Sequence, residues 1–188
     1  MKIRTLITAM LVTGISLPAL ADNQQNIMEA RKIIKQFASE LQTELKKGMK
    51  EGGPVNAISV CNDKAPAIAD SISASSGWLV ARTSLKPRAT ANNPLPWERK
   101  VMEEFEAKKA AGADIKTLDY ADVVEEDGKK VFRYMKAIPT KKVCLNCHGG
   151  DNVKPEVVMR LHSLYPSDRA RGFKEGDIRG AFVLKKTF

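Results

Sequence analysis

The sequence predicts an α+β fold in which N-terminal helices pack on an antiparallel sheet. Helical patterns fill residues 23–74, whereas strand patterns recur between residues 78 and 187. Two of the strands are joined by Asp127-Gly128, a dipeptide typical of a hairpin turn, and a hairpin pairs its strands antiparallel. Helices that precede such a sheet favour the α+β class over alternating βαβ units.

Residues 1–21 have the three parts of a secretory signal peptide. Lys2 and Arg4 give a basic start, an apolar run follows, and a small-x-small pattern ends at Ala21. The apolar run is shorter than the ~20 residues that a membrane-spanning helix needs. We therefore expect cleavage after Ala21 and export to the periplasm. Residues 22–188 are then expected to form one domain without a membrane span.

The first helical pattern, residues 23–48, carries apolar residues at three- to four-residue steps, which is typical of a helix with one packed face. This stripe consists of Ile27, Ile34, Phe37, Leu41 and Leu45. Gly48 and then Gly52-Gly53 are expected to end the helix. The stripe predicts a packing face, and it could also serve a homodimer.

The second helical pattern covers residues 54–74 and puts Cys61 on the buried face. Pro66 interrupts the pattern, because proline removes a backbone hydrogen bond and clashes with the preceding turn. We expect either a kink at Pro66 or a new helix capped by Asp63. In the second case Cys61 would lie just before a helix N-terminus, where the dipole favours a thiolate.

The remaining elements alternate between strands and short helices. Strands are predicted over residues 78–85, 118–124, 130–137 and 178–187, and helices over residues 97–111 and 155–165. A polar, proline-rich loop connects the first of these strands to the helix that follows. The four strands supply the antiparallel sheet that the fold class requires.

The segment Cys144-Leu145-Asn146-Cys147-His148 is a C-x-x-C-H motif, the attachment signal of a c-type haem. Two thiols one short turn apart can add to the two vinyl groups of a haem, and the adjacent imidazole then binds the iron as the proximal ligand. We therefore predict one covalent haem c on Cys144 and Cys147, with His148 on the iron. The export signal agrees, because such attachment takes place outside the bacterial cytoplasm.

Two other interpretations of the motif compete with haem. A bare C-x-x-C can be a thioredoxin-like dithiol, but that motif usually lies near the start of an α/β domain. A zinc site needs four ligands, which Cys61, Cys144, Cys147 and one of the two histidines could supply.

The second axial position of the iron is open on the residues alone. Two of the three cysteines would carry the haem, which leaves Cys61 unexplained in an exported protein. His162, a methionine such as Met135 or Met159, and a vacant position are the alternatives to Cys61. Each of these side chains also has an ordinary structural interpretation, as core filling or as surface.

The charge balance favours some partners over others. The chain carries a formal net charge of +9, spread along its length. Dispersed basicity permits attraction to an acidic redox partner or to anionic lipid. No stripe of Lys and Arg alternates with aromatic residues, so we expect no nucleic-acid binding.

Five stretches in this order and spacing resemble a domain-of-unknown-function family of extracytoplasmic c-type haem proteins with a PAS-like fold. They are residues 57–66, 82–86, 96–98, 144–149 and 176–181, and the resemblance extends over about residues 27–183. Members of that family are free periplasmic proteins or sensor modules of membrane-bound signalling proteins. One departure is that Ala89-Thr90 follows Arg88, where the family usually has Asn-Pro.

The resemblance implies an iron held by the motif histidine and by a cysteine in the early helical segment, which corresponds here to Cys61. It also makes Arg82, Lys86 and Arg88 candidates for contacts with the haem propionates, since arginine binds carboxylates bidentately. A bound thiolate would neutralise ferric porphyrin, so we expect a low reduction potential.

Three functional classes follow from this site. A redox or gas sensor is favoured, in which Cys61 leaves the reduced iron and a small gas such as NO or CO replaces it. Such a sensor needs a separate signalling or redox partner protein, because the chain has no visible output domain. A low-potential electron-transfer cytochrome is the alternative. An enzyme is least favoured, because a peroxidase needs an open iron site and Cys61 would block it.

Overall fold

The computed structural model of the chain describes residues 17–188. Most of the predicted signal peptide, residues 1–21, therefore lies outside the described residues. Within residues 17–188, no helix is both long enough and apolar enough to cross a membrane.

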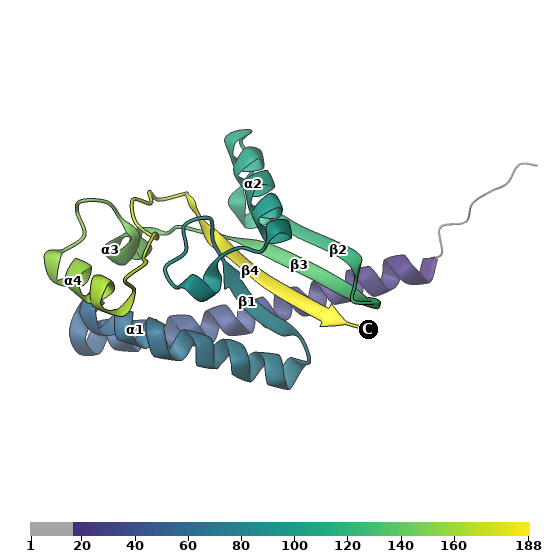
Figure 1. The fold of residues 1–188 in the computed structure, drawn as a ribbon, viewed down its shortest axis with the longest axis horizontal. Coiled ribbons are helices and arrows are strands. Elements are labelled where there is room, and N and C mark those ends of the chain that lie inside the picture. The colour runs from purple at the N-terminus through teal and green to yellow at the C-terminus, as the bar shows by residue number, and fades with distance from the viewer. Residues whose placement is uncertain (1–16) are drawn as a thin grey trace, which may run out of the picture.

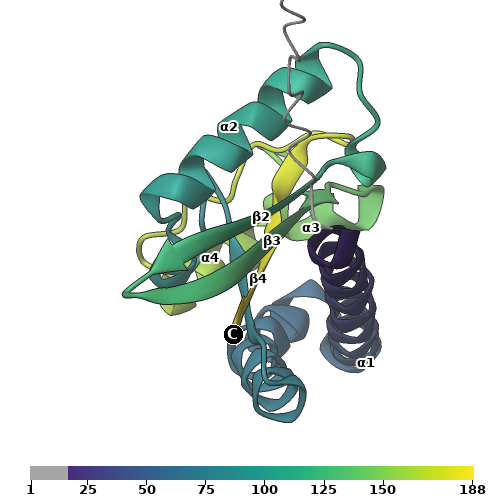
Figure 2. The ribbon, with the colours of Figure 1, turned by 90° about the vertical axis from the view of Figure 1, so that its right-hand side faces the viewer.

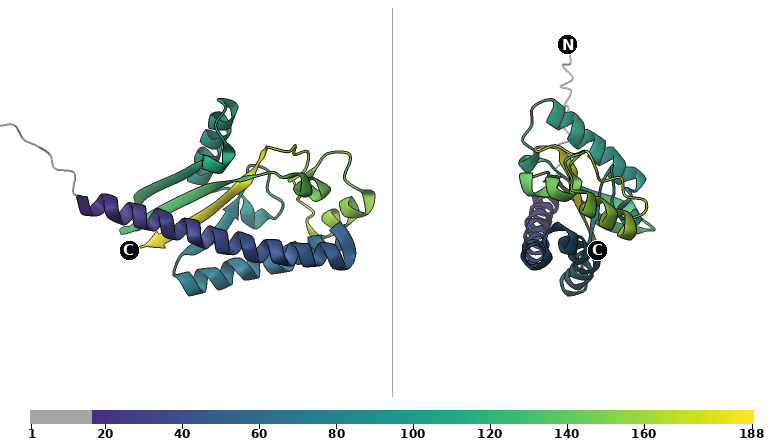
Figure 3. Two further views of the ribbon diagram at one scale, coloured as in Figure 1. Left: turned by 180° about the vertical axis from the view of Figure 1, so that it is seen from behind. Right: turned by 90° about the vertical axis from the view of Figure 1, so that its left-hand side faces the viewer.

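The N-terminal part of the chain is a helical hairpin. Helix α1 (Leu17–Ser76) contains two non-helical residues, Gly52 and Gly53, and at Gly53 φ is +65°, a conformation that favours glycine. The chain reverses there, and the two halves of α1 lie side by side along one edge of the molecule (Figures 1 and 3). Asn56 Nδ2 secures the bend by donating to the Gly48 carbonyl at 3.1 Å.

Of the two alternatives predicted at Pro66, the new helix capped by Asp63 is wrong. The second half of α1 begins after Gly53 and continues through Pro66 with helical backbone angles, so Asp63 caps no helix. Pro54 lies in the first turn, where a missing N–H is tolerated. The break thus falls where glycine allows a reversal, and Cys61 lies within a helix instead of before one.

Four strands form one antiparallel sheet in the order β1-β4-β3-β2. They are β1 (Leu79–Thr83), β2 (Asp119–Glu126), β3 (Lys129–Pro139) and β4 (Ile178–Thr187). The turn between β2 and β3 has positive φ at Asp127 (50°) and Gly128 (74°), which suits a tight hairpin. The last strand is central and pairs with both β1 and β3. The predicted fold class is confirmed.

Helices cover both faces of the sheet, as Figure 2 shows. The α1 hairpin packs on one face in a core that includes Phe37, Trp78 and Tyr134. Helix α2 (Pro96–Ala110) packs on the other face, where Phe105 and Met135 are fully buried. Period-two alternation along the strands sends neighbouring side chains into opposite cores.

Two short helices gather where the α1 hairpin bends (Figure 1). They are α3 (Leu145–His148) and α4 (Pro155–Leu164). A third apolar cluster joins α4 to α1 through Ile58, Val157 and Leu161, and Cys147 of α3 packs against this cluster. The C-x-x-C-H segment is therefore held between the end of the sheet and the early helical segment.

Candidate functional site

The C-x-x-C-H segment leaves the end of β3 through a 3-10 turn (Lys142–Cys144) and forms α3. Thr140 anchors its start, because its N–H donates to the Asp177 carbonyl at 2.7 Å and its carbonyl accepts from Gly176 at 3.0 Å. These bonds tie the segment to the residues that lead into β4. The central strand of the sheet therefore positions the motif.

His148 points into the protein, and one of its ring nitrogens, Nε2, carries no proton. Its Nδ1 lies 2.8 Å from the Ala170 carbonyl, and a carbonyl only accepts, so Nδ1 carries the proton and Nε2 keeps the lone pair. Burial, assisted by the nearby Arg179 cation, lowers the pKa of His148 well below its ordinary value. A neutral imidazole oriented by a backbone carbonyl is the usual form of a metal-binding histidine.

Arg179 on β4 lies in front of the unprotonated Nε2 of His148. Its Nε donates to His148 Nε2 at 3.3 Å, and its Nη1 donates to Ser84 Oγ at 3.2 Å. Burial, followed by repulsion from Arg88, lowers the pKa of Arg179 to about 10. We did not single out Arg179 in the sequence, although it lies in the 176–181 stretch that supports the family resemblance.

Cys61 and His148 border the same cavities between α1 and the motif. One cavity, of about 180 Å³, is lined by all three cysteines together with His148, and a second, of about 400 Å³, is lined by Cys61 and His148 without the motif cysteines. All three thiols are free. Burial raises the pKa of Cys61, opposed by the cations Arg82 and Arg88.

Two of the three predicted propionate contacts line these cavities. Arg82 and Arg88 border both of them, whereas Lys86 borders neither. Lys86 Nζ instead donates to the Arg171 carbonyl at 3.1 Å and lies over the Phe173 ring. The structure thus gathers the two arginines at the site and directs the lysine to the neighbouring loop.

The buried arginines carry more charge than their surroundings balance. Arg88 donates to Asp168 Oδ2 at 3.3 Å and to the Cys147 carbonyl at 2.7 Å, and only about a tenth of each partner side chain in this ion pair is exposed. Among the described side chains, neither Arg82 nor Arg179 pairs with a carboxylate. Buried charges without partners are strongly unfavourable. The charge of the site therefore favours an anionic ligand.

The alternative axial ligands lie away from these cavities. Met135 is fully buried in the core under α2, and Met159 is 67% exposed on α4. His162 is exposed on the same helix. In the described part of the chain, no three His, Cys, Asp or Glu side chains cluster closely enough to hold a metal ion, so the four-ligand zinc alternative has no preformed site there.

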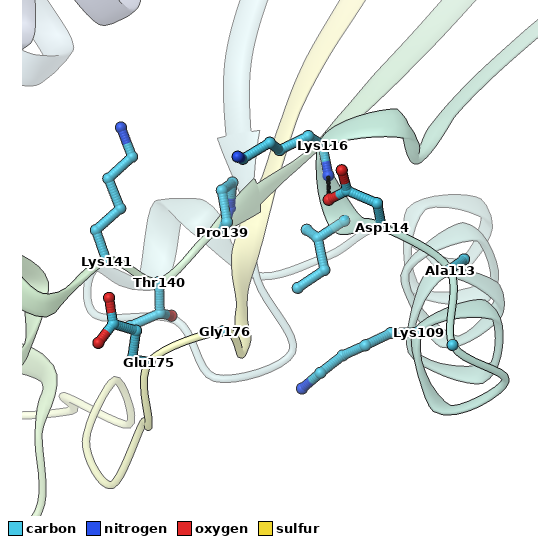
Figure 4. A pocket seen from close by; sticks show the side chains of 11 residues that line it. Lys109, Ala113, Asp114, Lys116, Pro139, Thr140, Lys141, Glu175 and Gly176 are labelled. Carbon is cyan, nitrogen blue, oxygen red and sulfur yellow. Dashed lines mark hydrogen bonds between the residues drawn. The ribbon is translucent and has the colours of Figure 1, made fainter.

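A larger surface cavity, of about 580 Å³, lies elsewhere. Figure 4 shows its lining between the end of α2, residues 113–116 and residues 139–141. Lys109 at its edge is paired with Asp177 at 2.9 Å. Neither the three cysteines nor His148 borders this cavity. It is therefore not the candidate functional site, although its volume is larger.

Fold and site together define a class of α+β protein in which a helical hairpin and a C-x-x-C-H segment enclose one cavity region. The chain belongs to the Tll0287-like family, whose model matches residues 20–186. This confirms the family resemblance found in the sequence. The chain is also similar to a solved structure described as the cyanobacterial heme-protein Tll0287, at 22% sequence identity and a TM-score of 0.63. That match covers 92% of this chain and 96% of the other, and at this identity it shows the fold. Comparison with curated proteins gave no match.

Proposed function

We propose that the chain is a periplasmic c-type haem protein with His148 and Cys61 as axial ligands, acting as a redox or gas sensor. The observation that carries the proposal is that His148 and Cys61 border the same cavities, with Cys144 and Cys147 at one of them. The relative of known structure is described as a heme-protein. A haem bound here would supply a redox-active iron.

The residues around the cavity fit this group in charge as well as in ligand type. A haem brings two propionate carboxylates, and Arg82 is a half-buried cation without a carboxylate partner among the described side chains. The nearby Arg88 has spare N–H donors beyond its bond to Asp168. Arginine and carboxylate form strong, charge-assisted pairs. The candidate propionate partners are therefore Arg82 and Arg88, with Lys86 outside the cavity.

Cys61 gives the proposed site its switch. A thiolate ligand favours the ferric state, because it neutralises the charge of a ferric porphyrin and reduction would then leave a net negative centre in a low-dielectric site. The environment of Cys61 favours the neutral thiol once the sulfur is free, since burial raises its pKa. Release of Cys61 as a thiol would open one axial position to a gas ligand. The proposed switch therefore has two states, one with Cys61 bound to the iron and one with Cys61 released.

An electron-transfer cytochrome of low potential is the second candidate. The observation that favours it is the formal net charge of +9, which suits encounter with an acidic redox partner. We do not assign an enzymatic activity. A sensor would need a signalling partner protein. A homodimer through the first half of α1 would offer such a partner a larger binding surface.

Spectroscopy of the ferric protein tests the ligand assignment. The mature chain is produced with cytochrome-maturation machinery, and a haem-stained denaturing gel checks covalent attachment. We expect Cys61→Ala to change the ferric spectrum and to raise the reduction potential. His162→Ala is the matched control and is expected to leave both unchanged. An unchanged Cys61→Ala spectrum would contradict the assignment.

Ligand exchange separates the sensor from the carrier. We expect CO to bind only after reduction, with loss of the Cys61 sulfur from the iron. Rapid, reversible electron cycling with no CO binding in either oxidation state would favour the electron carrier instead.

A further inference from the structure

Arg179 and a haem iron cannot use the same nitrogen of His148. The ring has one lone pair, on Nε2, because Nδ1 donates to the Ala170 carbonyl. Arg179 Nε already donates to that lone pair at 3.3 Å. Bonds from metal ions to histidine nitrogen are about 2 Å long, so an iron on Nε2 would occupy the space in front of the nitrogen. Arg179 must therefore move when the iron binds.

Arg179 borders two of the cavities around His148. They are a cavity of about 140 Å³ beside Ser84 and the cavity of about 400 Å³ beside Cys61, and His148 borders both. Withdrawal of the Arg179 guanidinium from His148 would enlarge the space in front of Nε2.

The contacts that hold Arg179 are polar but include no ion pair among the described side chains. Its Nη1 reaches Ser84 Oγ at 3.2 Å and the Lys86 carbonyl at 3.5 Å. Its guanidinium carbon lies 5.3 Å from the centre of the Phe173 ring. A carboxylate would be a better partner than any of these groups, because charge-assisted bonds are about twice as strong as neutral ones.

We propose that Arg179 is a displaceable cap on His148, which a haem replaces at Nε2 and whose guanidinium then pairs with a haem propionate. The inference rests on the proposed function and adds a residue to it. It assigns Arg179 two successive partners, the imidazole before the haem binds and a carboxylate afterwards. It also explains why a buried arginine faces the one ring nitrogen that a metal would need.

The test uses the apo full-length mature chain, produced without cytochrome-maturation machinery and kept reduced. Stopped-flow absorbance follows the binding of ferric haemin and of haemin dimethyl ester, in which both propionates are blocked. The proteins are wild type, Arg179→Met, Arg179→Lys and the control Arg171→Met. Arg171 donates to the Gly149 and Gly150 carbonyls beside the motif and does not border the three cavities.

Arg179→Met is expected to speed the association of both porphyrins, because the cap is gone. It is expected to speed haemin dissociation by about 10- to 100-fold, the loss of one charge-assisted contact, and to leave dissociation of the ester unchanged. Wild type itself should hold haemin more tightly than the ester, and Arg179→Lys should keep part of that difference. Arg171→Met should match wild type throughout.

Other outcomes would contradict the proposed role of Arg179 as a displaceable cap on His148. Equal association rates for wild type and Arg179→Met would show that Arg179 does not obstruct His148. An equal effect on haemin and ester would remove the propionate from the proposal and leave a structural role. If Arg179→Met fails to fold, the haemin-to-ester ratio of wild type and of Arg179→Lys decides the propionate contact. Absence of haem from the mature chain produced with cytochrome-maturation machinery would overturn the proposed function, which distinguishes that failure from failure of the cap alone.

Discussion

Gly180 lies on β4 directly beside the backbone of β1, and the substitution Gly180→Ala probes how closely these strands must approach. A Cβ on Gly180 would overlap the Thr83 carbonyl oxygen and would lie 3.3 Å from Ser84 Cβ. The nearest obstacle is backbone and cannot rotate away. The end of β1 would therefore have to separate from β4, and the bond from Ser84 Oγ to the Arg179 carbonyl, 2.8 Å long, would lengthen.

The size of the effect follows from that contact. Forcing an extra methyl group into a well-packed region costs about 1–3 kcal/mol. For a domain of about 150–250 residues, each kcal/mol lowers the melting temperature by roughly 2–4 °C. We therefore expect Gly180→Ala to melt about 2–12 °C below wild type. Because Ser84 and Arg179 also shift, haemin binding by this variant is expected to weaken as well.

Thermal unfolding followed by circular dichroism measures this change on the apo mature chain. Gly150→Ala is the matched control, since a Cβ there meets nothing within 4 Å and Gly150 is not among the residues with positive φ. It is expected to melt within about 2 °C of wild type. A Gly180→Ala protein that melts with wild type would refute the close approach of β1 and β4.

Two further predictions concern stability. A hydrogen bond from Lys185 is the main cause that holds the pKa of Glu126 below its ordinary 4.5. In urea unfolding, Glu126→Gln is therefore expected to lose about 0.5–1 kcal/mol of stability above pH 4.5. This loss is expected to vanish as the pH falls through the lower folded pKa of Glu126. Leu161→Ala, at a side chain only 2% exposed between α4 and α1, is expected to lose about 2–5 kcal/mol in the same assay at neutral pH. Met159→Ala on the exposed face of α4 is expected to stay within about 0.5 kcal/mol of wild type, and equal losses at both positions would contradict the packing of α4.

Local signals in the sequence were enough for most of the fold. The strand predicted over residues 178–187 has the bounds of β4, and Asp127-Gly128 forms the expected turn. The error at Pro66 has a physical reason. Proline is unfavourable inside an isolated helix, but tertiary packing can override that preference, and here Pro66 lies at the wall of the cavity beside Cys61.

The candidate site, like the fold, could be predicted only in part from the sequence. The C-x-x-C-H motif is readable from sequence because its chemistry needs neighbouring residues in a fixed spacing. Arg82 was predicted only through the family resemblance and Arg179 was not predicted. Both reach the site because β1 pairs with β4, so that the end of β1 and the start of β4 lie beside His148. Lys86 and Arg88 lie in the same loop, but their side chains have different partners, Arg171 and Asp168. Sequence spacing cannot predict the direction of a side chain in a loop.

The arginines constrain what the cavity can hold. Arg82, Arg88 and Arg179 are cations at one cavity region, and Asp168 is the one carboxylate that pairs with any of them among the described side chains. A neutral ligand would displace water from these cations without replacing its hydrogen bonds, which is unfavourable in a low-dielectric site. A ligand with two carboxylates would balance the excess of two charges. This need for charge balance does not depend on the C-x-x-C-H motif or on the axial ligands. Charge balance and the motif therefore support the proposed haem by separate arguments.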